Sequence, residues 1–165
     1  MKTIYLAGGC YWGTEHLFKQ VKGVTATTVG FANGNTENPT YEEVYTDTTG
    51  FAETVRIDYD DTVIALPRLL ELYFRSIDPT SLNQQGEDRG TRYRTGIYYT
   101  DSADLAVIRT FVDEQQTKHT APIVVEVEPL RNFYPADAYH QDYLDKHPDG
   151  YCHISLNLFR IAREW

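Results

Sequence analysis

The sequence predicts one α+β domain in which helices and strands share a single hydrophobic core. A chain of 165 residues is long enough for one such core and short for two. Hydrophobic residues make up 41% of it and charged residues 24%, as in ordinary globular domains, so the composition indicates neither disorder nor a membrane span. Strand-like and helix-like segments alternate without a linker, and we therefore treat 1–165 as a single domain.

Six elements are predicted in the first half of the chain. In order, they are a strand at 3–7, a helix at 11–20, a strand at 24–31, a short helix from Tyr41, a strand at 51–59 and a helix at 66–76. Thr40 and Glu43 stand at the spacing of a capping box, which predicts the start of the short helix. Pro67 stands in a first helical turn, where its missing N–H has no consequence.

The second half of the chain begins with a segment at 77–93 that carries no strong period. A loop of 17 residues in a compact domain is usually functional. Next come a predicted strand at 93–100, a helix capped by Ser102, a strand at 123–128 and a short helix at 138–145. This order leads us to expect a two-layer α/β sandwich with one mixed sheet and a ferredoxin-like core, followed at 146–165 by an irregular, mobile C-terminal tail.

The charge of the chain excludes one class of partner. A formal net charge of −9 argues against nucleic acid, because binding to a phosphate backbone depends on lysine and arginine. The one arginine cluster lies in EDRGTRYR, where Arg92 and its neighbours stand beside Glu87 and Asp88, and we interpret it as a loop of salt bridges. The longest apolar runs, such as IVVEV, are only strand-sized, so no membrane association is expected.

Cys10 and Cys152 are the only cysteines. The apolar stretch at 4–7 is shorter than the about 7 to 15 residues that a signal peptide needs, so we expect a cytoplasmic protein without a permanent disulfide. The two thiols are then either buried apolar fillers or redox-active groups. Cys10 follows a strand and a glycine pair and precedes a helix, where free N–H groups and the helix dipole favour a thiolate.

Cys152 lies in KHPDGYCHI, and the Pro and Gly of this stretch predict the mobility that a resolving thiol needs. Three histidines stand in the same region, at His140, His147 and His153. Their spacing to Cys152 matches no common zinc site, and we expect no metal there.

Glu53 is a carboxylate on the apolar face of the strand at 51–59, whereas the face of Ala52 is expected to be polar. Such a group either lies at the wet end of the strand or is buried with a raised pKa. Raising a glutamate pKa from about 4.3 to about 7 takes roughly 4 kcal/mol, which desolvation can supply. A neutral Glu53 can donate a proton at pH 7. Tyr41 at a helix start and Tyr93 on a strand face, each taken alone, fit ordinary packing.

Five motifs resemble, in order and spacing, the A-type peptide methionine sulfoxide reductases. They are GCYWGTEHLF, NPTYEEV, TGFAETVRIDYD, DPTSLNQQGEDRGTRYRTGIYY and FYPADAYHQDYL. The resemblance runs from about residue 4 to residue 154. It implies a single catalytic domain that reduces the S-epimer of methionine sulfoxide, free or in proteins, to methionine.

The resemblance implies catalytic roles for five residues. Cys10 is similar to the family's nucleophile, Glu53 to its acid and Asp88 to an active-site carboxylate, while Tyr41 and Tyr93 correspond to the hydroxyl donors to the sulfoxide oxygen. If the helix end lowered the Cys10 pKa from about 8.5 to about 6, the thiolate fraction would rise roughly 30-fold, but lower nucleophilicity would leave a net gain of about twofold. Protonation of the oxygen must therefore supply most of the acceleration.

The resemblance also assigns the substrate pocket and the recycling thiol. Tyr11 and Trp12 are similar to the aromatic pair that houses the substrate methyl group, and Cys152 is similar to the resolving cysteine of members with a GYC-type tail. Cys10 is then expected to become a sulfenic acid, which Cys152 converts to a disulfide. Thioredoxin, or dithiothreitol in vitro, is the expected external reductant, and no metal or organic cofactor is expected.

The chain departs from the family pattern at four positions. Tyr11 stands where the family usually has Phe, Phe31 where it has Tyr, Phe51 where it has His, and Glu87 where it has Asn. Tyr11 still supplies an aromatic face, so the methyl pocket is expected to survive. Glu87 adds a negative charge next to Asp88, which leaves the electrostatics of the loop open.

Two other functions use the same features. A thiol peroxidase would use the same pair, Cys10 and Cys152, but would prefer peroxide to methionine sulfoxide. A non-catalytic binding module would present its 13 tyrosines and 2 tryptophans to a sugar or peptide, and would keep ligand binding after Cys10→Ala.

Overall fold

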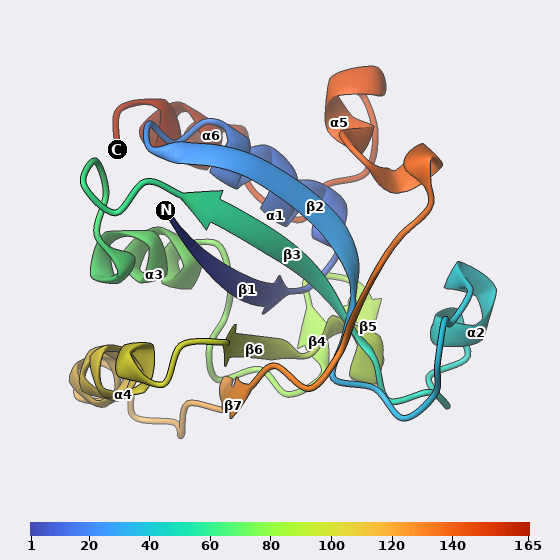
Figure 1. Ribbon diagram of the computed structural model, residues 1–165, viewed down its shortest axis with the longest axis horizontal. Helices are drawn as coiled ribbons and strands as arrows, with labels where there is room; N and C mark the ends of the chain where they lie inside the picture. Colours follow the sequence, from blue (N-terminus) through green and yellow to red (C-terminus); the bar gives the residue numbers. More distant parts are fainter.

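A six-stranded sheet runs through the middle of the molecule in the computed structural model, which describes residues 1–165 (Figure 1). In spatial order the strands are β7 (Glu126–Pro129), β6 (Thr95–Tyr99), β1 (Lys2–Gly8), β3 (Ala52–Tyr59), β2 (Val24–Ala32) and β8 (Phe133–Pro135). Every neighbouring pair is antiparallel except β6 and β7, which are parallel. The α+β class and the mixed sheet are thus confirmed, whereas the ferredoxin-like core and the two-layer sandwich stay predictions.

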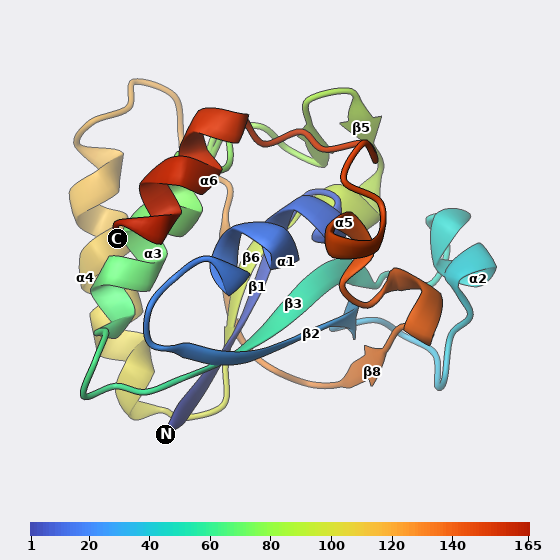
Figure 2. The same cartoon turned by 90° about the horizontal axis from the view of Figure 1, so that it is seen from above.

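Six helices accompany the sheet: α1 (Tyr11–Lys19), α2 (Tyr41–Tyr45), α3 (Leu66–Arg75), α4 (Ala103–Gln116), α5 (Tyr143–Lys146) and α6 (Leu156–Arg163). Helix α1 lies across β2 and β3, with α5 and α6 beside it (Figure 2). Helices α3 and α4 pack together at the opposite end of the molecule from α2 (Figure 1). None of the helices has the length and apolarity that a membrane crossing requires.

The main core lies between the sheet and the helices. Alternation in β1 and β3 turns Ile4, Leu6, Val55 and Ile57 to the same side, because Ile4 pairs with Ile57 and Leu6 with Val55. All four are fully buried in one cluster with the apolar side chains of α1 and α3. Burial of apolar surface, which stabilises the fold by about 25 cal/mol per Å², is the main force that holds α1 on the sheet.

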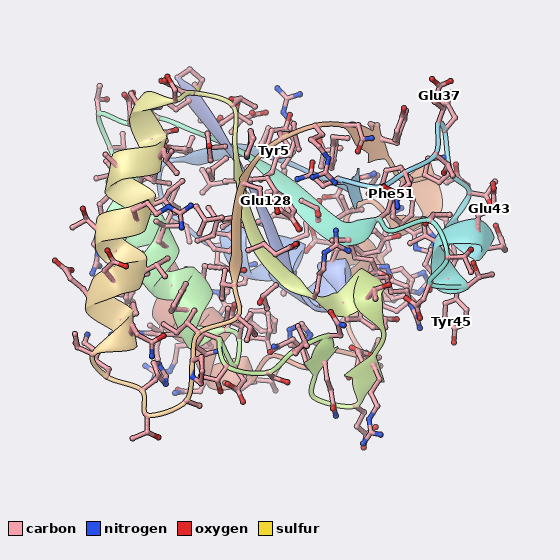
Figure 3. The ribbon with its side chains drawn as sticks, turned by 90° about the horizontal axis from the view of Figure 1, so that it is seen from below. Tyr5, Glu37, Glu43, Tyr45, Phe51 and Glu128 are labelled. Atoms are coloured by element: carbon pink, nitrogen blue, oxygen red, sulfur yellow. The ribbon has the colours of Figure 1, made fainter.

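The other face of the sheet is buried at its centre as well. Tyr5 lies on this face (Figure 3) and contacts Phe133, with 5.1 Å between the ring centroids. Ala52 and Thr54 of β3 are fully buried, whereas Arg56 is exposed. The expectation of a polar face on β3 is therefore wrong at its first half, because the chain near Leu130 and Phe133 covers it.

The loop at 77–93 contains short local structure that the sequence did not reveal. Strands β4 (Gln84–Gln85) and β5 (Asp88–Arg89) form a small hairpin, and a 3₁₀ turn follows at Thr91–Tyr93. Tyr93 therefore does not lie on the strand, which begins only at Thr95. Two arginines of the EDRGTRYR cluster form salt bridges, Arg92 with Asp47 and Arg94 with Glu126, and neither pairs with Glu87 or Asp88.

Three other expected elements differ in their ends. The strand expected at 123–128 is β7, which begins only at Glu126. Helix α4 is capped by the Asp101 carboxylate, which accepts the Ala103 N–H at 2.9 Å, while the Ser102 side chain makes no capping bond. The helix expected at 138–145 is divided, because Asp142 has a φ of 55° between a 3₁₀ turn and α5.

The expectation of an irregular C-terminal tail is wrong. Ser155 caps α6 by accepting the Leu158 N–H, and Leu158, Phe159 and Ala162 are buried where α6 packs on α1. Tertiary packing stabilises this helix, because eight residues are too few to be stable alone. Whether the segment before α6 moves stays a prediction.

Candidate active site

Cys10 occupies the junction between β1 and α1, as the sequence predicts. It is the residue before the first turn of α1, and only 6% of it is exposed. Gly9 before it has a φ of 84°, and a Cβ there would lie 2.9 Å from the Cβ of Gln85 in β4. Glycine at this position therefore lets the hairpin of the 77–93 loop close over the thiol.

Glu53 lies beside Cys10, and the structure decides between its two alternatives. The residue is 2% exposed, so it is buried and not at a wet strand end. Its Oε1 accepts the backbone N–H of Tyr11 at 3.2 Å, so the carboxyl binds a free N–H in the first turn of α1. Burial raises the pKa of Glu53 to about 8, while the Tyr11 N–H and the Arg92 charge oppose that shift. The carboxyl is therefore mostly protonated at pH 7.

The protonation expected for Cys10 is wrong in this structure. Burial raises the pKa of the Cys10 thiol well above its usual value, and a charge on Glu53 raises it further. The Trp12 backbone N–H acts in the opposite direction, as the helix end should, but it is the smaller effect. The resting pair is therefore a neutral thiol next to a neutral carboxyl, because the loss of water outweighs the helix end.

Two tyrosines approach Glu53 from different segments. Tyr41 opens α2, where Thr40 and Glu43 form the predicted capping box at 3.1 and 3.0 Å. Tyr93 is buried in the 3₁₀ turn. Burial, and then a charge on Glu53, raises the pKa of each, to about 12 for Tyr41, so both hydroxyls stay protonated donors.

Arg92 holds this side of the site in place, a role that sequence analysis missed. Its guanidinium stacks on the rings of Tyr93 and Tyr45, at 4.4 and 4.2 Å, and pairs with Asp47. Glu43 and Tyr45 of α2 are exposed and project outward from the helix (Figure 3).

An aromatic wall connects α1 to the 3₁₀ turn at Ala138–His140 and to the start of α5. Trp12 stacks on Tyr143 with centroids 3.7 Å apart, and its indole N–H donates to His140 Nδ1 at 3.2 Å. His140 in turn stacks on Tyr41 at 4.5 Å. Burial lowers the pKa of His140, which keeps the ring neutral and its Nδ1 free to accept. The FYPADAYHQDYL motif contains both residues of this wall that come from the C-terminal half, but their spacing alone indicated no role.

Asp88 lies on β5 near both reactive groups, since its charge raises the pKa of Cys10 and of Glu53. Its Oδ2 atom is buried and accepts no hydrogen bond. Burial raises the pKa of Asp88, while the Tyr151 hydroxyl and the Arg92 charge lower it. Glu87 is exposed, so its extra charge faces solvent.

The other departures from the family pattern are buried. Phe31 is in contact with Tyr11, at 5.8 Å between ring centroids, so two of the four departures lie side by side. Phe51 packs against Tyr134 at 5.8 Å and lies over Gly34, where a Cβ would come within 2.2 Å of the Phe51 ring. Both are core positions next to the site.

Cys152 lies in the segment between α5 and α6, and its sulfur packs against Gly13 in the first turn of α1, the helix that begins after Cys10. Both thiols are free, and Cys152 is close enough to raise the pKa of Cys10. A Cβ on Gly13 would lie 2.8 Å from the Cys152 sulfur. Because Gly13 is three residues after Cys10, it shares the helix face of the reactive thiol. Because glycine has no side chain, Gly13 leaves the space on α1 that the Cys152 sulfur occupies.

Gly13→Ala is expected to slow the joining of the two thiols without blocking the first reaction of Cys10. The added methyl would have to displace the Cys152 sulfur, because 2.8 Å is too close for such a pair. Rapid-quench measurement of free thiols, after one equivalent of oxidising substrate, should show disulfide formation slowed by about tenfold or more, the factor that 1.4 kcal/mol of misplacement gives. The control is the first half-reaction of the same variant, because the reaction of Cys10 with the oxidising substrate does not require Cys152 and should keep its wild-type rate. An unchanged rate in Gly13→Ala contradicts the role of Gly13.

No group of three or more histidine, cysteine, aspartate or glutamate side chains is arranged to hold a metal ion. Two of the histidines considered from the sequence, His140 and His147, contact the ring of Tyr139.

The comparisons with known proteins agree on one family. The family described as peptide methionine sulfoxide reductase matches residues 2–164 of the chain. The peptide methionine sulfoxide reductase MsrA of Clostridium acetobutylicum is 55% identical over 160 residues, which cover 97% of this chain and 99% of that relative. Mxr1 of Saccharomyces cerevisiae in its reduced form has a TM-score of 0.89 at 40% identity, covering 94% of this chain and 91% of Mxr1. Mxr1 in complex with Trx2 has a TM-score of 0.62 at 32% identity, covering 86% and 84%.

Proposed function

The chain belongs to the peptide methionine sulfoxide reductase family, whose members are oxidoreductases, and on this premise we propose that it reduces the S-epimer of methionine sulfoxide with Cys10 as nucleophile and Glu53 as acid. The observation that supports this most is a buried carboxyl with a pKa of about 8, bound to the end of the helix that follows Cys10. A carboxyl in that state is a proton donor at neutral pH.

In the first step the Cys10 sulfur attacks the sulfoxide sulfur and a sulfur–sulfur bond forms. As the protonated oxygen passes from the substrate sulfur to the Cys10 sulfur, the sulfur–oxygen bond of the substrate and the new sulfur–sulfur bond both break, and methionine leaves. The oxygen ends on Cys10 as a sulfenic acid, so the substrate sulfur gains two electrons and Cys10 loses two. Glu53 gives its proton to the oxygen and takes up the proton that the thiol releases. Because the thiol and the carboxyl begin neutral, this transfer leaves no net charge in the buried site.

The neighbouring residues hold the substrate for this step. The hydroxyls of Tyr41 and Tyr93 donate to the sulfoxide oxygen, where negative charge gathers as the bond weakens. The faces of Trp12 and Tyr11 enclose the methyl group. The Asp88 Oδ2 atom, which has no partner in the protein, accepts an N–H of the bound residue.

Cys152 completes the oxidative half of the cycle. Its thiol attacks the Cys10 sulfenic acid, the oxygen leaves as water, and a Cys10–Cys152 disulfide forms. A groove of about 400 Å³, lined in part by Leu144, Cys152 and Phe159, gives an external dithiol access to this disulfide. Thioredoxin is the proposed reductant, supported by the structure of Mxr1 with Trx2, and dithiothreitol replaces it in vitro.

Cys152→Ser is expected to release one methionine per enzyme and then stop when thioredoxin is the only reductant. The first half-reaction needs only Cys10, but without a second thiol no disulfide forms for thioredoxin to attack. Chromatography of the methionine formed in the first seconds measures the single turnover, and dithiothreitol should restore cycling because a small thiol reaches the sulfenic acid directly. Repeated turnover of this variant with thioredoxin would refute the resolving role of Cys152.

The test of the function is a stereochemical assay. The protein is incubated with the S- and R-epimers of N-acetylmethionine sulfoxide and with hydrogen peroxide, each coupled to thioredoxin oxidation. Methionine from the S-epimer alone supports the proposal, whereas a preference for peroxide supports a thiol peroxidase. Absence of turnover, with ligand binding intact in Cys10→Ala, supports a binding module. A cytoplasmic location, and activity on free or protein-bound sulfoxide without a metal or organic cofactor, belong to the same proposal.

A further inference from the structure

The hydroxyl of Tyr11 is a buried polar group without a partner. Tyr11 is 1% exposed, yet its Oη atom makes no hydrogen bond. Nearly all buried side-chain donors in proteins have a partner, because an unpaired one loses its water without replacement. The ring alone would serve as a wall for a methyl group, and a phenylalanine would do so without burying a hydroxyl. The hydroxyl therefore has no role in packing and no partner within the protein.

The surroundings of this hydroxyl belong to the reactive site. Tyr11 is the first residue of α1, directly after Cys10, and its backbone N–H is bound to Glu53. Its ring lies between Phe31 and His140, at 5.8 and 5.7 Å. After burial, charges on Glu53, Tyr41, Cys10 and Tyr93 all raise the pKa of Tyr11. The phenol therefore stays protonated and lies in range of all the groups that handle the oxygen.

From this arrangement we propose that Tyr11 Oη is a third hydroxyl donor to the sulfoxide oxygen, beside Tyr41 and Tyr93. This inference rests on the proposed function and adds a residue to its catalytic set. A sulfoxide oxygen is a strong acceptor, and it accepts more strongly as negative charge gathers on it. The thioether product has no such oxygen, so the Tyr11 hydroxyl distinguishes the substrate from the product and favours release of methionine.

The other unpaired buried tyrosine hydroxyl does not share this setting. Tyr59, at the end of β3, also has a buried Oη without a partner, but the charges that act on it are those of Asp104 on α4 and Lys2 at the start of β1, followed by two loop aspartates. Tyr59→Phe is therefore a matched control, since it removes the same atom from the same kind of site outside the reactive centre.

The test is Tyr11→Phe, which keeps both ring contacts and removes only the oxygen. We expect kcat/KM for the S-epimer to fall by about 10- to 100-fold, the usual effect of one hydrogen bond to a charged acceptor. Tyr59→Phe should remain within about twofold of the wild type. In a Cys10→Ser background, Tyr11→Phe should weaken binding of methionine sulfoxide but not of methionine, as followed by tryptophan fluorescence. A role in packing alone would not change that ratio.

The possible outcomes distinguish failure of the proposed function from failure of the third hydroxyl donor. A wild-type protein without activity on the S-epimer refutes the proposed function itself. An active wild type and a Tyr11→Phe variant with the same kcat/KM refute the third donor and leave Tyr11 as a wall of the pocket. Equal loss of affinity for sulfoxide and for methionine refutes it too. A Tyr11→Phe/Tyr41→Phe double variant that loses less than the product of the two single losses supports donors that act on one oxygen.

Discussion

Glu53→Gln is expected to lower kcat/KM for the S-sulfoxide by about 10²- to 10³-fold and at the same time to stabilise the protein at neutral pH. Glutamine keeps the Oε1 atom that accepts the Tyr11 N–H, so the end of α1 stays in place. It has no acidic proton to give to the oxygen. The loss should therefore appear in the single-turnover rate, measured by rapid quench, and exceed any change in sulfoxide affinity.

The same substitution should change how stability depends on pH. The folded pKa of Glu53, about 8, is raised above its ordinary value of 4.5 by burial. Below pH 4.5 the carboxyl is protonated in both the folded and the unfolded state, so it does not make stability depend on pH. As pH rises from 4.5 to about 8, the unfolded state gives up this proton while the folded state keeps it, and the wild type loses stability. At pH 7 the loss amounts to roughly 3 kcal/mol, which Glu53→Gln should remove.

Urea denaturation at pH 5, 7 and 8 measures this effect, with Glu87→Gln as the control. Glu87 is an exposed glutamate of the same region, so its amide should leave the pH dependence of unfolding as in the wild type. Wild-type activity should also fall above about pH 8, as Glu53 ionises and loses the proton it donates. Either of two results contradicts a neutral Glu53. One is a single-turnover rate in Glu53→Gln equal to that of the wild type. The other is a difference in unfolding free energy between Glu53→Gln and the wild type that is the same at all three pH values.

Cys10→Ser should abolish sulfoxide reduction, with a loss of at least about 10⁴-fold, as when other enzymes lose their nucleophile. A serine hydroxyl fits the space of the thiol but is a far weaker nucleophile, and it has no accessible oxidised state to receive the oxygen. Because Glu53, Tyr41 and Tyr93 remain, the variant should still bind methionine sulfoxide.

Two measurements check this prediction. Methionine formation with dithiothreitol should be absent in Cys10→Ser and present in Cys152→Ser, which separates the nucleophile from the resolving thiol. Wild-type Cys10 should also react slowly with iodoacetamide at pH 7, because burial leaves it 6% exposed and raises its pKa. Sustained turnover by Cys10→Ser would mean that another group receives the oxygen.

The sequence by itself determined the elements whose patterns are local and strong. The alternation at 51–59 predicted β3, and the period of the leucines at 66–76 predicted α3. The glycine pair before Cys10 predicted the junction of strand and helix, and Thr40 with Glu43 predicted the capping box before Tyr41. A carboxylate on an apolar strand face marked Glu53, because that pattern alone shows a polar group in a place that excludes water.

Only the tertiary structure decided the properties that depend on residues far apart in the chain. Spacing showed Cys10 at a helix end, but the hairpin of the 77–93 loop and the Glu53 carboxyl close around it, and desolvation then outweighs the helix end. The sulfur of Cys152 approaches Gly13 from 139 positions away, and His140 bonds to Trp12 across 128. Local patterns record which face of an element is apolar, whereas burial and the approach of distant segments exist only after the chain has packed.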